Sequence, residues 1–229
     1  MSKPKLISFD CYGTLIDWET GILSALEPVL AAHGCALPNA EILRRYARIE
    51  STLQKGPYQS YREILRGVTR QFGVELDFAP TGSELDAIPD SLPNWQPFPD
   101  TVAALKQLKR QHRLAILSNI DDDLFAATAK HLEVAFDLVI TAQQLSCYKP
   151  ERRNFEVLRE RGGVAPSELL HAAESVYHDI IPARELGLKT AWVNRRNQCT
   201  ISLTGPPDPR EQPDFECVDL QALVELLGG

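Results

Sequence analysis

The 229-residue sequence contains no apolar run that approaches the about 18 residues a membrane span needs. The five residues before the first apolar run are too few and too polar to form a signal peptide. No CxxC pair occurs, and the five cysteines, an odd number, are scattered along the chain. These absences favour reduced thiols in a cytoplasmic protein without a membrane partner.

Positive charge is also scarce. The 24 Lys and Arg residues are outnumbered by 31 Asp and Glu residues, which gives a formal net charge of −7, and the basic residues form no cluster. This distribution argues against nucleic acid or an anionic membrane surface as a partner. Hydrophobic residues make up 44% of the chain and charged residues 24%, which is ordinary for a globular protein whose partner is a small molecule.

Five short apolar runs, separated by helical patterns, predict a parallel sheet. They span residues 5–10, 113–119, 137–142, 169–174 and 189–194. The helical patterns span residues 99–112, 121–131, 182–186 and 219–227. Continuous apolar strands that alternate with helices indicate a sheet covered on both faces. We therefore expect an α/β fold with a Rossmann-like core.

The long interval after the first strand breaks this rhythm. The patterns there predict helices over residues 18–33, 40–54, 58–72 and 84–88, the third ending at Gly73. A helical insertion is the simplest account, with the proline-rich residues 89–99 as the return linker. We expect a core of residues 1–15 and 97–229 and a helical cap of residues 16–96.

Chemically versatile side chains stand where the predicted strands end. Ligands of open α/β sheets bind beyond the carboxyl ends of the strands, so these side chains are expected to share one site. Four strands contribute them: Asp10 from the first, Ser118 and Asn119 from the second, Lys149 after the third, and Glu174 and Asp179 from the fourth.

The residue types indicate covalent catalysis. A carboxylate at Asp10 can attack carbon or phosphorus and form an intermediate that water then hydrolyses. Lys149 would hold Asp10 ionised and offset developing negative charge. Thr14 offers a hydroxyl near the reacting centre, and Ser118 and Asn119 would orient an anionic group of the substrate.

These residues carry a family resemblance. Residues 10–17 (DCYGTLID) resemble the first motif of the haloacid dehalogenase superfamily. Residues 118–119 (SN), residues 149–150 (KP) and the Glu174–Asp179 pair are similar to its second, third and fourth motifs, in the same order. The resemblance covers essentially the whole chain, including the cap. It implies a hydrolase with an aspartate nucleophile.

The position two residues after the nucleophile favours a dehalogenase. Phosphatases of the superfamily carry a second Asp there, which protonates the leaving alcohol, and this chain has Tyr12. A halide leaves without a proton, and the first motif is similar to that of the L-2-haloacid dehalogenases. Residues 45–50 (RYARIE) look like the cap helix that gives these enzymes an arginine for the departing halide. Arg45 is the matching position, with Arg44 and Arg48 as close competitors.

The resemblance thus implies hydrolysis of a small 2-haloacid through an aspartyl ester, without a cofactor. It also points to a small anionic substrate and a homodimer. The implied site divides into two groups. The catalytic group is Asp10, Lys149, Asp179, Glu174 and Arg45, and the substrate-binding group is Tyr12, Thr14, Ser118 and Asn119.

Other positions depart from the dehalogenase pattern. Dehalogenases carry Ser and Asn where this chain has Glu174 and Val176, and a Tyr where it has Phe155. The Glu174–Asp179 pair resembles the acids with which phosphatases bind Mg²⁺, and the ligands would then be Asp10, Glu174 and Asp179. A Mg²⁺-dependent phosphatase acting on a small phosphorylated metabolite through an aspartyl phosphate is therefore the alternative. A non-catalytic, regulatory descendant of the fold is a second alternative.

Overall fold

The core of the protein is a six-stranded sheet in which all neighbouring strands are parallel. The computed structural model describes residues 3–195 and 212–228. In spatial order the strands are β3 (Leu138–Thr141), β2 (Arg113–Ser118), β1 (Leu6–Phe9), β4 (Leu169–Ala173), β5 (Lys189–Val193) and β6 (Phe215–Cys217). The first five confirm the predicted strands, and the order 3-2-1-4-5-6 is that of a Rossmann-like fold.

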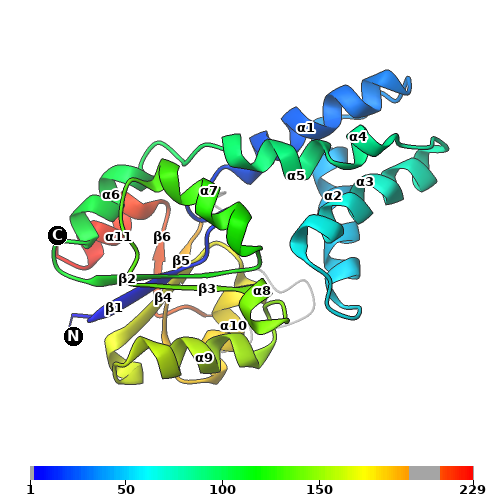
Figure 1. Ribbon diagram of the computed structural model, residues 1–229. Helices are drawn as coiled ribbons and strands as arrows, with labels where there is room; N and C mark the ends of the chain where they lie inside the picture. Colours follow the sequence, from blue (N-terminus) through cyan, green and yellow to red (C-terminus); the bar gives the residue numbers. More distant parts are fainter. Residues whose placement is uncertain (1–2, 196–211, 229) are drawn as a thin grey trace.

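Helices cover both faces of the sheet, as continuous apolar strands require. One face carries α6 (Thr101–Leu108), α7 (Asp122–Leu132) and α11 (Leu220–Leu226) (Figure 1). The other carries α8 (Ala142–Leu145), α9 (Arg152–Gly162) and α10 (Ile181–Glu185). A 3₁₀ turn, η2 (Pro166–Glu168), leads into β4, and a π-helical turn, η3 (Val176–Ile180), leads into α10. The central strand β1 is buried along its whole length.

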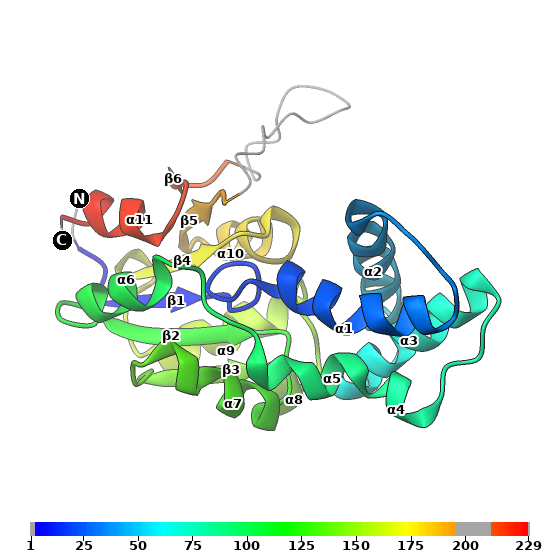
Figure 2. The same ribbon diagram turned by 90° about the horizontal axis from the view of Figure 1, so that it is seen from above.

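A group of helices lies between β1 and α6 in the sequence and stands beyond the carboxyl ends of the strands (Figures 1 and 2). It consists of α1 (Trp18–Ala32), α2 (Asn39–Gln54), α3 (Tyr61–Leu76), α4 (Gly82–Leu85), α5 (Ala87–Ser91) and the 3₁₀ turn η1 (Leu92–Asn94). Apolar residues one helical turn apart hold it together, among them Ile42, Ile64 and Phe72, which are at most 1% exposed. We call this group the cap helices. The division of the chain at residues 16–96 stays a prediction.

Two details of the predicted cap are wrong. Helix α3 does not end at Gly73 but continues to Leu76. Gly73 is needed for a close approach, since a Cβ there would lie 2.5 Å from the carbonyl oxygen of Phe78. The return segment is not a linker from residue 89 onward, because helix and 3₁₀ turn continue to Asn94. Pro89 lies in the first turn of α5, where its missing N–H leaves no bond unmade.

Helix α9 and strand β6 have no counterpart among the predictions. Strand β6 has only three residues and lies at the edge of the sheet, so its sequence pattern is weak. Four cysteines lie in the part of the chain that the structure describes, and all four are unpaired thiols; Cys199 lies outside it. None of the described helices combines the length and apolarity needed to cross a membrane.

The packing of α1 yields a test of the cap. Gly21 is buried, and a Cβ at this position would lie 2.4 Å from the ring of Trp95. Overpacking of this kind destabilises a protein by about 1–3 kcal/mol, so we expect Gly21→Ala to lower the free energy of unfolding by that amount. Urea unfolding followed by circular dichroism measures the change. Gly82→Ala is the matched control, because a Cβ at Gly82 meets nothing within 4 Å. Equal stability of the two variants would contradict this account of the packing.

Candidate active site

Asp10 follows β1 directly, at the carboxyl edge of the sheet. Its backbone N–H donates to the carbonyl of Ala172 on the neighbouring strand at 3.1 Å. The chain then turns sharply at Gly13, whose φ of +98° favours glycine. This turn returns the hydroxyl of Thr14 to Asp10, where Oγ1 donates to Oδ2 at 2.8 Å. The first motif thus holds one oxygen of the carboxylate by its own loop.

The other carboxylate oxygen accepts from a buried lysine. The Nζ of Lys149 lies 2.8 Å from Asp10 Oδ1, 2.7 Å from Asp179 Oδ1 and 3.0 Å from the carbonyl oxygen of Leu117. The three charged residues are 9% exposed or less. Burial by itself would lower the pKa of Lys149, but the two carboxylates outweigh it and raise that pKa above its usual value. The ammonium group is therefore permanently charged and fixed between two anions.

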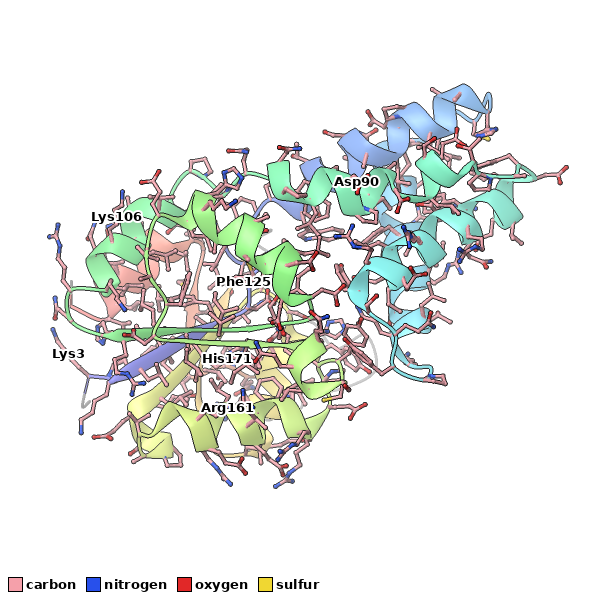
Figure 3. All side chains as sticks on the ribbon, viewed as in Figure 1. Lys3, Asp90, Lys106, Phe125, Arg161 and His171 are labelled. Atoms are coloured by element: carbon pink, nitrogen blue, oxygen red, sulfur yellow. The ribbon has the colours of Figure 1, made fainter. Side chains whose placement is uncertain are left out.

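A buried histidine hydrogen-bonds to Asp179. His171 lies on β4, is fully buried, and places Nε2 at 2.9 Å from Asp179 Oδ1 and Nδ1 at 2.9 Å from Ser8 Oγ. Figure 3 shows His171 in the interior of the core, on the side of the sheet that α9 covers, where Phe155 packs edge-on against its ring. Burial would raise the pKa of Asp179, but Lys149 and His171 outweigh it and lower that pKa to about 2.

His171 and Ser8 were not predicted as site residues, although the sequence contains a signal for them. Both residues interrupt otherwise apolar strands, and the register pairs them directly across β1 and β4. A polar residue buried in a strand needs a hydrogen-bond partner, so two such residues in neighbouring strands indicate contact.

The second motif anchors the lysine. The side chain of Asn119 accepts from the backbone N–H of Lys149 at 2.7 Å and donates to its carbonyl oxygen at 3.1 Å. This pair of hydrogen bonds fixes the start of the segment after α8 against the end of β2. Ser118 is 3% exposed and lies at the same edge of the sheet. Asn119 therefore positions Lys149 as well as facing the cavity.

A small cavity opens above Asp10, between the core and the cap helices. Its volume is about 100 Å³. A larger adjoining cavity shares five of its lining residues. The core contributes Asp10, Tyr12, Ser118, Asn119, Lys149, Ser175, His178 and Asp179, and the cap helices contribute Glu50, Gln54 and Tyr61.

A core carboxylate fixes the cap helices over this cavity. Asp121, which is 3% exposed, accepts from the backbone N–H groups of Tyr61 and Arg62 at 2.9 Å each. These are the first N–H groups of α3, which have no partner within the helix. The hydroxyl of Tyr148 adds a hydrogen bond to the carbonyl of Gln59 at 2.9 Å. The start of α3 is thereby held against the core, with Tyr61 beside the cavity.

Tyr12 lines both cavities but directs its hydroxyl elsewhere. The hydroxyl lies 2.8 Å from Thr128 Oγ1, and the ring packs edge-on against Trp95. Burial raises the pKa of the Tyr12 phenol well above its usual value. This side chain is consequently a poor acid for a leaving group, as the absence of an Asp at this position predicts.

Of the three acids of the conditional metal site, Asp10 and Asp179 meet at Lys149, whereas Glu174 does not line the cavity that contains them. Asp179 already accepts from Lys149 and His171, and both Lys149 and Asp179 are nearly inaccessible. The side chain of Glu174 lines the cavities beside Trp18 rather than the one that contains Asp10. Within the described residues, His, Cys, Asp and Glu side chains form no cluster of three or more that could hold a metal ion. The donors present do not fit Mg²⁺ coordination.

Arg45 lines neither of the two cavities described above, and its expected role with the departing halide stays a prediction. Its guanidinium pairs with Glu41 at 2.6 Å and with Glu75 at 3.0 Å, on the side of α2 that faces away from the cavity. Arg44 and Arg48, the other two candidate arginines, pair with the same two acids: Arg44 with Glu41 and Arg48 with Glu75. The residues of α2 that line the two cavities are Tyr46, Ala47, Glu50, Ser51 and Gln54.

Glu50 and His178 also line the cavity, and neither was predicted as a site residue. Glu50 comes four residues after the buried Tyr46, so both lie on the same face of the helix. This spacing places an ionisable residue beside an apolar helix face. His178 comes three residues after Ser175, and its Nδ1 lies 3.0 Å from Ser175 Oγ. Burial lowers the pKa of His178, which favours the neutral ring.

Comparison with known proteins follows this geometry. Residues 4–187 match the family of haloacid dehalogenase-like hydrolases. An (S)-2-haloacid dehalogenase of Pseudomonas sp. (strain YL) is 29% identical over 236 aligned residues, covering 99% of this chain and 95% of the relative. Haloacetate dehalogenase H-2 of Moraxella sp. (strain B) is 26% identical over 237, covering 99% of each. The structure of L-2-haloacid dehalogenase from Xanthobacter autotrophicus with chloropropionic acid covalently bound superposes with a TM-score of 0.81, at 22% identity and 99% coverage of each chain.

The position of Arg45 yields a second test. Because its side chain is paired on the far side of α2, we expect Arg45→Ala to change kcat/KM for halide or phosphate release by less than about threefold, far below the about 100-fold or greater loss typical of removing a charge-stabilising group. Steady-state kinetics measure the change. Lys149→Ala is the comparison variant, and it should abolish turnover. A loss of about 100-fold in Arg45→Ala would return this arginine to the site.

Proposed function

The chain belongs to the haloacid dehalogenase-like hydrolase family, and from that premise we propose that it hydrolyses the carbon–halogen bond of a small 2-haloacid through an aspartyl-ester intermediate. The observation that carries the proposal is the fixed carboxylate of Asp10, held by Thr14 and Lys149 at the floor of a cavity of about 100 Å³. Such a carboxylate is oriented, ionised and shielded from bulk water, as a nucleophile requires.

The reaction would proceed in two steps. A carboxylate oxygen of Asp10 attacks the carbon that bears the halogen, the carbon–halogen bond breaks, and the halide leaves with the bonding electrons. Water then attacks the carbonyl carbon of the ester, which releases the 2-hydroxyacid and a proton and restores the carboxylate of Asp10. Lys149 stabilises the oxyanion that develops during this second step.

The leaving group separates this proposal from phosphate-ester hydrolysis. An alkoxide needs a proton as it departs, whereas a halide does not. The side chain two residues after the nucleophile is Tyr12. Its hydroxyl faces Thr128, and burial raises the pKa of its phenol. Of the acids that would bind Mg²⁺ for phosphoryl transfer, Glu174 does not line the cavity of Asp10 and Asp179, and Asp179 is already engaged by Lys149. Both observations support a halide as leaving group.

The relatives support the same substrate class. The two curated relatives described above are a 2-haloacid dehalogenase and a haloacetate dehalogenase. Both names denote substrates with a carboxylate next to the carbon that bears the halogen. A cavity of about 100 Å³ suits molecules of this size. We further propose that residues 16–96 form the cap and that the protein is a homodimer. We also propose a cytoplasmic location, which is in keeping with the unpaired thiols of the described cysteines.

The nucleophile is tested directly. Asp10→Asn should abolish halide release, because an amide is a poor nucleophile, while the circular dichroism spectrum stays that of the parent. Single turnover in ¹⁸O-labelled water should place the label in Asp10 of the unmodified chain, as mass spectrometry of the peptide would show. Label found in the hydroxyacid while Asp10 remains unlabelled would mean that water attacks the substrate directly.

Metal dependence is tested with the same assay. Because no step of the proposal uses a metal, we expect dialysis against EDTA to leave halide release from 2-chloropropionate within about twofold of its starting value, and added Mg²⁺ to have no larger effect. Glu174→Gln should show the same indifference to Mg²⁺. Release of phosphate from phosphate esters that EDTA abolishes and Mg²⁺ restores, with no halide from any 2-haloacid, would replace this proposal with the phosphatase alternative.

A further inference from the structure

The cap helices bring an acid to the cavity that the reaction above does not use. Glu50 lies on α2 and lines both cavities at the boundary between cap helices and core. Its Oε1 accepts from the hydroxyl of Tyr61 at 2.6 Å and from that of Tyr46 at 3.3 Å, and the two hydroxyls lie 3.0 Å apart. Both tyrosines are at most 6% exposed, so the acid is held in place by a rigid frame.

The charges around the cavity mean that an ionised Glu50 would repel an anionic substrate. Of the described side chains that line the cavity with Asp10, only Lys149 is permanently cationic, and Asp10 and Asp179 already share it. His178 has a pKa lowered by burial and is neutral. With Glu50 ionised, the lining would carry two net negative charges before a substrate entered. Repulsion between like charges is strong where water is excluded.

We propose that Glu50 takes up a proton when a small carboxylate binds in this cavity, so that the substrate anion lies beside a neutral carboxylic acid. The proposal rests on the proposed function for the class of ligand. The proton comes from solvent and returns to solvent when the product leaves. Glu50 would thereby act as a specificity-determining residue, because an uncharged donor can hydrogen-bond a carboxylate that an ionised one would repel.

The surroundings of Glu50 already favour the protonated form of its carboxyl group. Burial raises its pKa, the hydrogen bonds from Tyr61 and Tyr46 lower it, and the charge of Asp10 raises it, with a net upward direction. A bound carboxylate would act in the same sense as Asp10. The titratable groups that face Glu50 or line the same cavities are Tyr46 from α2, Tyr61 from α3, Asp10 and Tyr12 from the loop after β1, and Lys149, Glu174, His178 and Asp179 from the core.

Two consequences follow for binding. Each bound carboxylate should carry up to about one proton from solvent into the complex, and above the pKa of free Glu50 the affinity should weaken by up to about tenfold per pH unit. In Glu50→Gln the side chain is neutral at every pH and keeps its hydrogen-bonding shape. This variant should bind without proton uptake, and its affinity should be nearly constant between pH 6 and pH 8.

Calorimetry with propionate tests the proposal. Propionate has the carboxylate but no leaving group, so it can be titrated into the unmodified chain. Titrations at one pH in buffers of different ionisation enthalpy give the number of protons taken up. The unmodified chain and Glu41→Gln should take up protons, whereas Glu50→Gln should not. Glu41 is the matched control, since it lies on the same helix but lines neither cavity.

Several outcomes would overturn the proposal. They are the absence of proton uptake in the unmodified chain, uptake that persists in Glu50→Gln, and failure of propionate to bind. Uptake lost only in His178→Asn would assign the proton to the histidine instead. Measurement of halide release distinguishes this proposal from the proposed function. Halide release without proton uptake on propionate binding would reject only the role of Glu50. Proton uptake without halide release from any 2-haloacid would reject only dehalogenation.

Discussion

The buried ammonium group of Lys149 is the interaction on which this site depends. It lies between Asp10 and Asp179 and is 2% exposed. Burying three charges costs several kcal/mol for each ion unless every one is paired and hydrogen-bonded. The surroundings meet this requirement: Thr14 donates to the nucleophile, His171 to Asp179, and Leu117 offers its carbonyl to the ammonium. Removing Lys149 would leave two buried carboxylates without their cation.

The topology of the sheet makes this arrangement possible. Strands β2, β1 and β4 are neighbours and run parallel, so their carboxyl ends meet at one edge. Each strand is buried on both faces and is apolar, and its polar residues therefore collect at that edge or pair across the register, as Ser8 and His171 do. A rigid sheet thus holds the reacting carboxylate, its cation and the second acid without help from the cap helices.

The cap helices add a different kind of control. Helix α2 turns its arginines outward to Glu41 and Glu75 and its Tyr46–Glu50 face toward the cavity. Asp121 of the core fixes the start of α3, which aligns that face with Asp10. The cap side of the cavity that contains Asp10 is therefore lined by an acid, Glu50, an amide, Gln54, and a phenol, Tyr61. We expect the charge of this wall, as well as its shape, to select the substrates.

Local patterns are sufficient to predict the α/β class, the five apolar strands and the helical insertion, because strand burial and helical periodicity can be read from neighbouring residues. They also predict that Asp10, Thr14, Asn119, Lys149 and Asp179 are neighbours, since all five follow the ends of parallel strands, which meet at one edge of the sheet. The direction of side chains on α2 was decided by the tertiary structure alone. Arg45 and Glu50 occupy one helix, and only the packing of α2 on α3 and the core determines which of them faces the cavity. The separation of Glu174 from Asp179 was likewise decided in three dimensions, because Asp179 lies within the π-helical turn and Glu174 precedes it.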